Sequence, residues 1–222
     1  MALDVAAWSP YARAMTQIHS LFVTKVYRTM LRGKAVQTLN EDLGHAARAL
    51  AADDAAGQSW SAEKNYPGYT SYASLNDLTW RSPEFADLQR HLDTHALAFA
   101  KELDFDLGGT PLALSSLWVN LLDPGGWHTA HIHPHSVLSG TYYVEVPPGS
   151  GAIRFEDPRH AFMMAAPPRK VRCKREQQSF VTFDPKPGML LLWESWLRHE
   201  VPINRASEPR LSISFNYGWG ES

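Results

Sequence analysis

Four of the ten histidines in this 222-residue chain fall within one short run, WHTAHIHPHS, and their spacing suits metal binding. They are His128, His131, His133 and His135. Histidine is the commonest metal ligand of proteins because its neutral imidazole offers a nitrogen lone pair. On a β-strand, residues i and i+2 project from the same face about 6.6 Å apart, so two imidazoles can tilt onto one ion. His131 and His133 are therefore the first two candidate ligands.

A third ligand has to come from elsewhere in the chain. His135 has the same parity as the first two, but Pro134 ends regular strand pairing before it. His199 is the better candidate, because it follows the strongly apolar run MLLLWE, which begins after a Pro-Gly pair. Taken alone, His199 is more simply a hydrogen-bonded surface histidine. The H-x-H motif and an arginine eleven residues later favour a ligand instead.

That arginine, Arg210, begins the segment RLSISFNYGW, which alternates polar and apolar residues as a half-buried strand does. The apolar positions must face a packed layer, and the polar positions share the opposite face. The polar positions are Arg210, Ser212, Ser214 and Asn216. Inside a barrel, the Arg210 guanidinium could bind a carboxylate bidentately, with the Ser212 hydroxyl completing the site. An edge strand with its polar face in water is the alternative.

The elements that would position these side chains differ between the two halves of the chain. In the first half, Leu21–Leu31 is rich in β-branched and aromatic residues and predicts a strand. Apolar residues at helical spacing predict a helix over Lys34–Asp53, closed by Gly57 and the polar run after it, and a second helix over Ser82–Asp104. Between the helices, Asn65–Leu75 has the composition of a turn-rich loop.

The second half has short strand-like runs separated by Pro and Gly turns, which predict a sandwich or barrel. The runs are Leu112–Leu122, Thr141–Val146, Ala152–Glu156, Gly188–Trp193 and Arg210–Tyr217. The expected fold is mainly β with α: a double-stranded β-helix (a cupin-like jelly roll) flanked by N-terminal helices. We expect one domain over residues 1–222, with residues 1–110 packing on a jelly-roll core at 111–222 that holds the metal site.

The composition narrows the function. The chain carries 21 Lys and Arg against 23 Asp and Glu, which gives no electrostatic footprint for nucleic acid or for a membrane surface. A neutral or small anionic substrate fits better. Cys173 is the single cysteine, so neither an intrachain disulfide nor a thiolate metal cluster is expected. Met1–Met15 lacks the pattern of a secretory signal, and no apolar run reaches the ~20 residues of a membrane span. We expect a cytoplasmic protein; homo-oligomer formation is left open.

Together, these motifs resemble the Fe(II)/2-oxoglutarate oxygenase superfamily. Its pattern is a first His, a ligand two residues on, a distal His after a Pro-Gly strand, and Arg-x-Ser about ten residues beyond. More closely, HIHPHSVLSGTYYVEVPPG and the later FEDPR resemble a bacterial and phage branch of 2OG-Fe(II) oxygenases with the hallmark H-x-H-P followed by S-G-x-Y-Y. The resemblance covers roughly residues 20–219 and is specific mainly after Leu117.

The resemblance implies a hydroxylase-type oxygenase acting on an unidentified small-molecule or peptide substrate. It implies His131, His133 and His199 as Fe(II) ligands and Arg210 with Ser212 at the distal carboxylate of the co-substrate 2-oxoglutarate. No catalytic residue is expected beyond the metal site. Two further candidates for co-substrate binding are Tyr142, since one of the adjacent Tyr142 and Tyr143 must face inward, and Asn120, which could reach the metal-proximal carboxylate.

His133 departs from the superfamily pattern. Most members carry a carboxylate at this position, and the two-His, one-carboxylate triad marks non-haem iron oxygenases. A three-His site resembles cupin-type dioxygenases that act without 2-oxoglutarate, and Gly125–His133 has the cupin spacing G-x5-H-x-H. The Glu expected a few residues later is replaced by Val137 and Leu138. Such a dioxygenase, and a non-catalytic jelly roll that binds a metal or small molecule, are therefore the alternatives.

Overall fold

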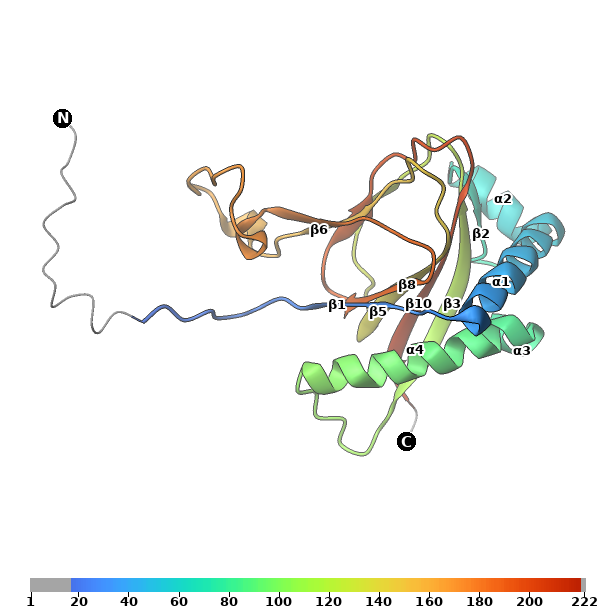
Figure 1. Ribbon diagram of the computed structural model, residues 1–222, viewed down its shortest axis with the longest axis horizontal. Coiled ribbons are helices and arrows are strands. Elements are labelled where there is room, and N and C mark those ends of the chain that lie inside the picture. Colours follow the sequence, from blue (N-terminus) through green and yellow to red (C-terminus); the bar gives the residue numbers. More distant parts are fainter. Residues whose placement is uncertain (1–16, 221–222) are drawn as a thin grey trace, which may run out of the picture.

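The structure is a computed structural model that describes residues 17–220. Within these residues, two antiparallel sheets face each other, and the helices lie on the outer side of the larger sheet (Figure 1). The expected jelly roll flanked by N-terminal helices is confirmed. The segment Met1–Met15, for which no secretory signal is expected, lies outside the described residues. None of the helices within 17–220 combines the length and apolar character needed to cross a bilayer.

The helices are α1 (Lys34–Asp53), α2 (Ala55–Glu63), α3 (Leu78–Arg81) and α4 (Pro83–Glu102). The strands are β1 (Val26–Met30), β2 (Gly68–Thr70), β3 (Leu112–Leu122), β4 (His128–His131), β5 (Leu138–Glu145), β6 (Ile153–Glu156), β7 (Phe180–Phe183), β8 (Met189–Glu194), β9 (His199–Val201) and β10 (Arg210–Trp219). In the described residues the larger sheet has the order β1-β8-β5-β10-β3-β2, and the smaller has the order β4-β9-β6-β7.

The main hydrophobic core lies between the helices and the outer face of the larger sheet. Leu43 of α1 and Phe85, Leu88 and Leu92 of α4 are fully buried there against the apolar positions of β10. Those positions are Leu211, Ile213, Phe215 and Tyr217, as the alternation in the sequence predicts. The polar positions of β10 therefore face the other way, into the space between the two sheets.

A smaller core lies between the two sheets at one end of the barrel. Tyr143, Phe155, Leu191, Trp193 and Leu197 are buried in it. Its side chains come from β5, β6 and β8 and from the turn before β9. Tyr143 and Trp193 of this core also line the cavity between the sheets, together with the polar residues of β10.

The helix over Lys34–Asp53 is confirmed, but the expectation that Gly57 ends it is wrong. The helix ends at Asp53, and Gly57 lies inside α2 instead. Asp54 starts this new helix, because its carboxylate accepts hydrogen bonds from the backbone N–H of Gly57 and from the Tyr69 hydroxyl. The second predicted helix is confirmed as α4, one to two residues shorter at each end.

Most predicted strands are found, but several short ones were missed. The strand over Leu21–Leu31 is confined to Val26–Met30, the part that pairs with β8. β2 lies inside the segment predicted as a loop, and β7 and β9 also had no signal. These strands have three or four residues each, and their pairing with distant strands, not a local pattern, defines them.

The connection between β6 and β7 projects away from the barrel as an arm (orange in Figure 1). None of residues 158–180 is buried. The arm carries the run RKVRCKR at Arg169–Arg175, which has five basic residues. The net charge of the chain is near neutral, yet this segment is a local cluster of positive charge, which the overall composition does not reveal.

Candidate active site

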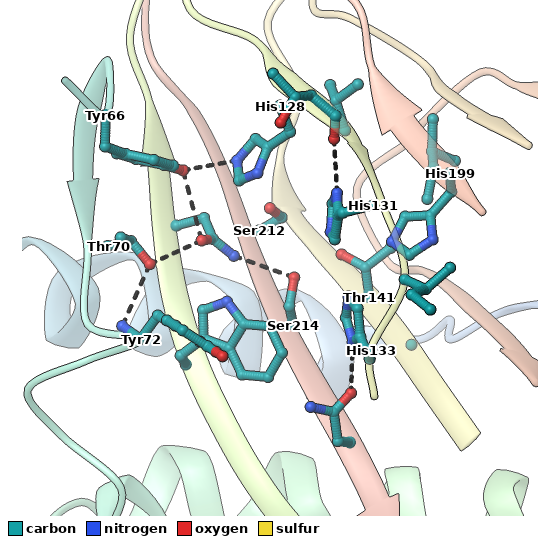
Figure 2. Close-up of a pocket in the computed structure, with 18 of the residues that line it drawn as sticks. Tyr66, Thr70, Tyr72, His128, His131, His133, Thr141, His199, Ser212 and Ser214 are labelled. Atoms are coloured by element: carbon teal, nitrogen blue, oxygen red, sulfur yellow. Dashed lines mark hydrogen bonds between the residues drawn. The ribbon is translucent and has the colours of Figure 1, made fainter. Parts of the chain in front are cut away.

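Three histidines from two neighbouring segments meet at one end of the space between the sheets. One ring nitrogen each of His131, His133 and His199 lies within 4.8 Å of the others. His131 and His199 are paired across β4 and β9. Figure 2 shows all three side chains on the same side of the pocket. Among the described residues, this is the group of His, Cys, Asp or Glu side chains whose geometry could hold a metal ion.

The hydrogen bonds of the three rings determine which nitrogen is left for a metal. Nδ1 of His131 lies 2.7 Å from the Thr129 carbonyl oxygen, and Nδ1 of His199 lies 2.9 Å from that of Leu197. Nδ1 of His133 lies 2.6 Å from Asn216 Oδ1. Since each Nδ1 faces an acceptor, it carries the proton, and each Nε2 keeps its lone pair. All three imidazoles are thus held in the tautomer that binds a metal through Nε2.

The backbone explains how a motif spaced for a strand can place both of its histidines. β4 ends at His131, with an irregularity in its pairing to β9, so His133 lies just beyond the strand. The backbone N–H of His133 donates to the Ser195 carbonyl oxygen, which holds the segment beside β8. His135 adopts a positive φ of 68° at the following turn and does not line the pocket. The expectation that His135 lies beyond the strand is confirmed.

The electrostatics of the site keep several of its imidazoles neutral. Burial, together with the neighbouring His131 ring, lowers the pKa of His199 to about 3. Burial also lowers the pKa of His133, and the hydrogen bond with Asn216 offsets part of this effect. Since a metal competes with protons for imidazole, groups that are already neutral near pH 7 are ready to bind one.

The three histidines line a cavity of about 360 Å³ between the sheets. The polar side chains of β10 form part of its floor, as the alternation predicts: Arg210, Ser212, Ser214 and Asn216. Arg210 is buried, and only 3% of its surface is exposed to solvent. Its Nη1 donates to the Gly151 carbonyl oxygen, and its guanidinium carbon lies 5.7 Å from the centre of the Tyr143 ring.

The guanidinium of Arg210 has bonding capacity to spare. Its Nε is buried and has no hydrogen-bond partner among residues 17–220. A buried, unsatisfied donor on a cation costs free energy, which an anion in the cavity would recover. The residues present therefore fit a carboxylate at this end of the cavity and a metal ion at the three histidines.

Asn120 lies on β3 and faces the same cavity. Its Oδ1 accepts from the Thr70 hydroxyl at 2.9 Å, and its Nδ2 donates to Ser214 Oγ at 3.1 Å. Tyr66 lies at the edge of this network and pairs with His128 Nε2 at 2.8 Å. Figure 2 shows Tyr66 and Thr70 opposite the three candidate ligands, with Ser212 and Ser214 between them. Asn120 is thus in the cavity, although its amide is engaged by protein groups.

The assignment of Tyr142 to co-substrate binding is wrong. Its side chain packs in the core beneath the helices, and its hydroxyl donates to Asn40 Oδ1 of α1 at 2.6 Å. Tyr143 is the residue of the pair that lines the cavity. The register explains this outcome: Tyr142 lies opposite Ile213, an outward position of β10, whereas Tyr143 lies opposite Ser212. Paired residues share a face of the sheet.

Several residues that shape the site had no assigned role in the sequence analysis. Asn216 holds His133, and the Tyr66–His128 pair closes one side of the cavity. The parity of Asn216 with Arg210 was a usable signal, since it placed the amide on the inward face of β10. Tyr66 comes from a segment predicted as a loop, and nothing local marks it as part of the site.

Comparison with known proteins bears on the same segment. Residues 116–216 match the family model described as "Putative 2OG-Fe(II) oxygenase". This segment contains the three histidines, Asn120, Arg210 and Ser212. A search of curated protein sequences found no match.

Solved structures with TM-scores above 0.5 share the fold at low sequence identity. A Pseudomonas putida prolyl-4-hydroxylase is 16% identical with a TM-score of 0.58, over 89% of this chain and 95% of its own. The non-heme alpha ketoglutarate dependent epimerase SnoN from nogalamycin biosynthesis is 19% identical with a TM-score of 0.57, over 89% and 79%. A Burkholderia pseudomallei oxidoreductase of the 2OG-Fe(II) oxygenase family is 15% identical with a TM-score of 0.39 and aligns over 50% of this chain and 46% of its own.

The jelly-roll fold of this chain is thus shared with the prolyl-4-hydroxylase and the epimerase SnoN, and three of its histidines could hold a metal ion. The match of residues 116–216 relates this segment of the chain to the 2OG-Fe(II) oxygenase family. The matched family implies an enzyme of the oxidoreductase class with Fe(II) as cofactor and 2-oxoglutarate as co-substrate.

Proposed function

We propose that the chain is a hydroxylase-type oxygenase in which His131, His133 and His199 hold Fe(II). The observation that carries this assignment is the shared geometry of the three imidazoles. Each has its Nδ1 beside an oxygen acceptor, and one nitrogen of each lies within 4.8 Å of the others. Imidazole nitrogen is a suitable donor for Fe(II), and three ligands leave positions for further groups.

We further propose that Arg210 and Ser212 bind the distal carboxylate of 2-oxoglutarate. The buried, unpartnered Nε of Arg210 supports this role. Asn120 faces the same cavity and is our candidate contact for the carboxylate nearer the metal. Tyr143 replaces Tyr142 as the tyrosine in reach of the co-substrate, because it lines the cavity beside Arg210.

In this proposal the protein binds, orients and shields the reacting groups. Thr129, Leu197 and Asn216 fix the orientation of the three imidazoles through their Nδ1 atoms. Trp193, 4.7 Å from the His199 ring between centroids, covers that ligand from water. Fe(II) and 2-oxoglutarate, when bound, supply the activation of O2, with 2-oxoglutarate converted to succinate and CO2.

The third imidazole favours one competing function. His133 stands where the superfamily usually has a carboxylate, so a three-His dioxygenase that needs no 2-oxoglutarate is the second candidate. The two functions differ at Arg210, because a dioxygenase that acts directly on its substrate has no need of a carboxylate site. We propose a small-molecule or peptide substrate and a cytoplasmic location; neither depends on which function is correct.

Substitution of Arg210 separates the two candidates. Arg210→Ala should raise the Kd for 2-oxoglutarate about ten- to a hundredfold, the usual effect of losing a charge-assisted pair. Its Fe(II) content should stay at the wild-type level, because Arg210 is not a candidate ligand. Arg205→Ala is the matched control, since Arg205 is exposed and does not line the cavity. Calorimetric titration of the anaerobic Fe(II) protein with 2-oxoglutarate measures the Kd of each variant, and elemental analysis measures its Fe(II) content. Equal 2-oxoglutarate affinity in a folded Arg210→Ala variant would contradict the proposal and favour the second candidate.

A further inference from the structure

One wall of the cavity consists of aromatic side chains that the proposed function does not use. Trp60 comes from α2, Tyr72 follows β2, and Trp118 lies on β3. Between ring centroids, Tyr72 lies 6.1 Å from Trp60 and 5.2 Å from Trp118, and Trp118 lies 5.9 Å from His133. Trp60, Tyr72 and Trp118 therefore form a continuous series, which we call the aromatic row. It leads from the surface to a candidate iron ligand.

The aromatic row lies outside the two hydrophobic clusters of the fold. Trp118 retains 8% of its exposed surface, yet it belongs to neither hydrophobic core. Tyr72 is 59% exposed at the rim of the cavity. Aromatic side chains with one face on a cavity are a common feature of ligand sites, because the ligand buries the area that the fold leaves open.

Charge restricts what the row can bind. Among the cavity-lining side chains of residues 17–220, Arg210 is the one with a permanent charge, and none is a carboxylate. The proposed function assigns Arg210 to 2-oxoglutarate, so no counter-ion is left for a substrate. Burial of an unpaired charge is costly. The part of the substrate that lies against the aromatic row must therefore be uncharged.

We propose that the aromatic row binds an uncharged, planar ring of the substrate and that the substrates are neutral, ring-containing molecules. This inference rests on the proposed function, because it takes Arg210 to be occupied. A ring that stacks against Trp118 lies beside His133, whereas the carboxylate site lies at the Arg210 end. The substrate ring and the distal part of 2-oxoglutarate therefore occupy different regions of one cavity.

Three probes with the same ring but different charge test this substrate class. They are indole (neutral), tryptamine (a cation at pH 7.5) and indole-3-carboxylate (an anion). Equilibrium dialysis under anaerobic conditions measures each against the protein as purified and against protein with Fe(II) and saturating 2-oxoglutarate. Indole should bind in both states without displacement by 2-oxoglutarate. Both charged probes should bind the protein loaded with Fe(II) and 2-oxoglutarate more weakly than indole, by about tenfold or by a larger factor.

Variants locate the binding. Tyr72→Leu and Trp118→Leu should each weaken indole binding about two- to tenfold, the effect expected for one aromatic contact, and leave 2-oxoglutarate affinity unchanged. Trp80→Leu is the matched control, because Trp80 is 85% exposed on α3 and does not line the cavity. Tyr72 lies at the rim, so its variant keeps the test valid if Trp118→Leu does not fold.

Three results would overturn the inference. The first is wild-type indole affinity in Tyr72→Leu, and the second is equal affinity of the loaded protein for the charged and neutral probes. The third is displacement of indole by 2-oxoglutarate. Failure of the proposed function gives a different pattern. In that case 2-oxoglutarate does not bind, or its affinity does not respond to Arg210→Ala. The indole measurements on the protein as purified still report on the aromatic row.

Discussion

Hydrogen bonds to the Nδ1 atoms allow three histidines from different backbone contexts to present equivalent nitrogens. Two of the acceptors are backbone carbonyls two residues earlier in the chain, at Thr129 and Leu197. The third acceptor is the side chain of Asn216, which also accepts from Ser139 and donates to Ser116. The orientation of His133 therefore depends on a side chain that can be changed without altering the ligands themselves.

Asn216→Leu should lower the affinity for Fe(II) about ten- to a hundredfold, the usual cost of removing a partner behind a metal-binding histidine. Asn216→Asp keeps an acceptor oxygen for His133 and should retain most of the affinity. Anaerobic titration with Fe(II) and elemental analysis measure both variants. Equal affinity in Asn216→Leu and wild type would mean that His133 does not hold the metal.

His128 links the site to the pH dependence of stability. Burial, with nearby Arg210, lowers the pKa of His128 to about 3, against ~6.5 for an unperturbed histidine. Since the unfolded chain takes up this proton first, the contribution is complete above pH ~6.5 and declines as the pH falls toward 3. At pH 5 the metal-free protein should lose at most about 2 kcal/mol of unfolding free energy through this one group.

His128→Gln should therefore show a shallower loss of stability between pH 7.5 and 5 than the wild type. Urea unfolding of the metal-free proteins at both pH values measures the difference. His135→Asn is the control, because His135 is exposed and does not line the cavity. Parallel pH profiles for wild type and His128→Gln would contradict the assigned environment of His128.

At the scale of elements, the sequence predicts the helices and strands whose own residues show a helical or strand-like spacing of apolar side chains. α1, β3 and the alternation of β10 follow from local patterns and were predicted, β3 and α1 with the observed limits. Which residues of β5 face the cavity could not be predicted in this way. Tyr142 and Tyr143 are adjacent and of the same type, so the local sequence does not show which of the two points inward. Only the register with β10, shifted by an irregularity between Leu211 and Ser212, decides between them.

The contact between β5 and β10 also explains a glycine in the middle of the larger sheet. A Cβ at Gly140 would lie 2.3 Å from Cζ of Phe215 and 2.6 Å from the Leu191 carbonyl oxygen. Gly140→Ala should therefore lower the unfolding free energy by about 1–3 kcal/mol, as overpacking of a core does. Gly218→Ala is the control on β10, where a Cβ would meet only Ser115, at 3.7 Å. Denaturant unfolding compares the two; equal stability losses would contradict the predicted steric cause.

At the scale of the whole molecule, the helices and the larger sheet share one core. Leu88 of α4 is fully buried in the same cluster as Ile213 and Phe215 of β10. We therefore propose that the described residues 17–220 belong to one domain, as expected for the chain, in which residues 17–110 are not stable without the jelly roll. The sequence predicted this arrangement of layers because helical stripes and strand alternation each mark one apolar face.

A single domain should unfold in one cooperative transition. Leu88→Ala, which removes buried side-chain volume between α4 and the sheet, should lower the unfolding free energy by about 2–5 kcal/mol and shift the whole transition. Circular dichroism for the helices and the fluorescence of the barrel tryptophans, recorded in chains with Trp60 of α2 and Trp80 of α3 replaced by Phe, should give the same midpoint. Separate midpoints for the two signals would show that the helices and the jelly roll unfold independently.

The most direct test of the whole account is the formation of the Fe(II)–2-oxoglutarate complex. Titration of the anaerobic Fe(II) protein with 2-oxoglutarate should produce a weak metal-to-ligand charge-transfer band that saturates at one co-substrate per chain. The band should be absent in His131→Ala, since two remaining ligands hold a divalent ion poorly. If the wild-type protein binds Fe(II) but 2-oxoglutarate produces no band, the co-substrate does not chelate iron at the three histidines. That result would contradict the proposed site.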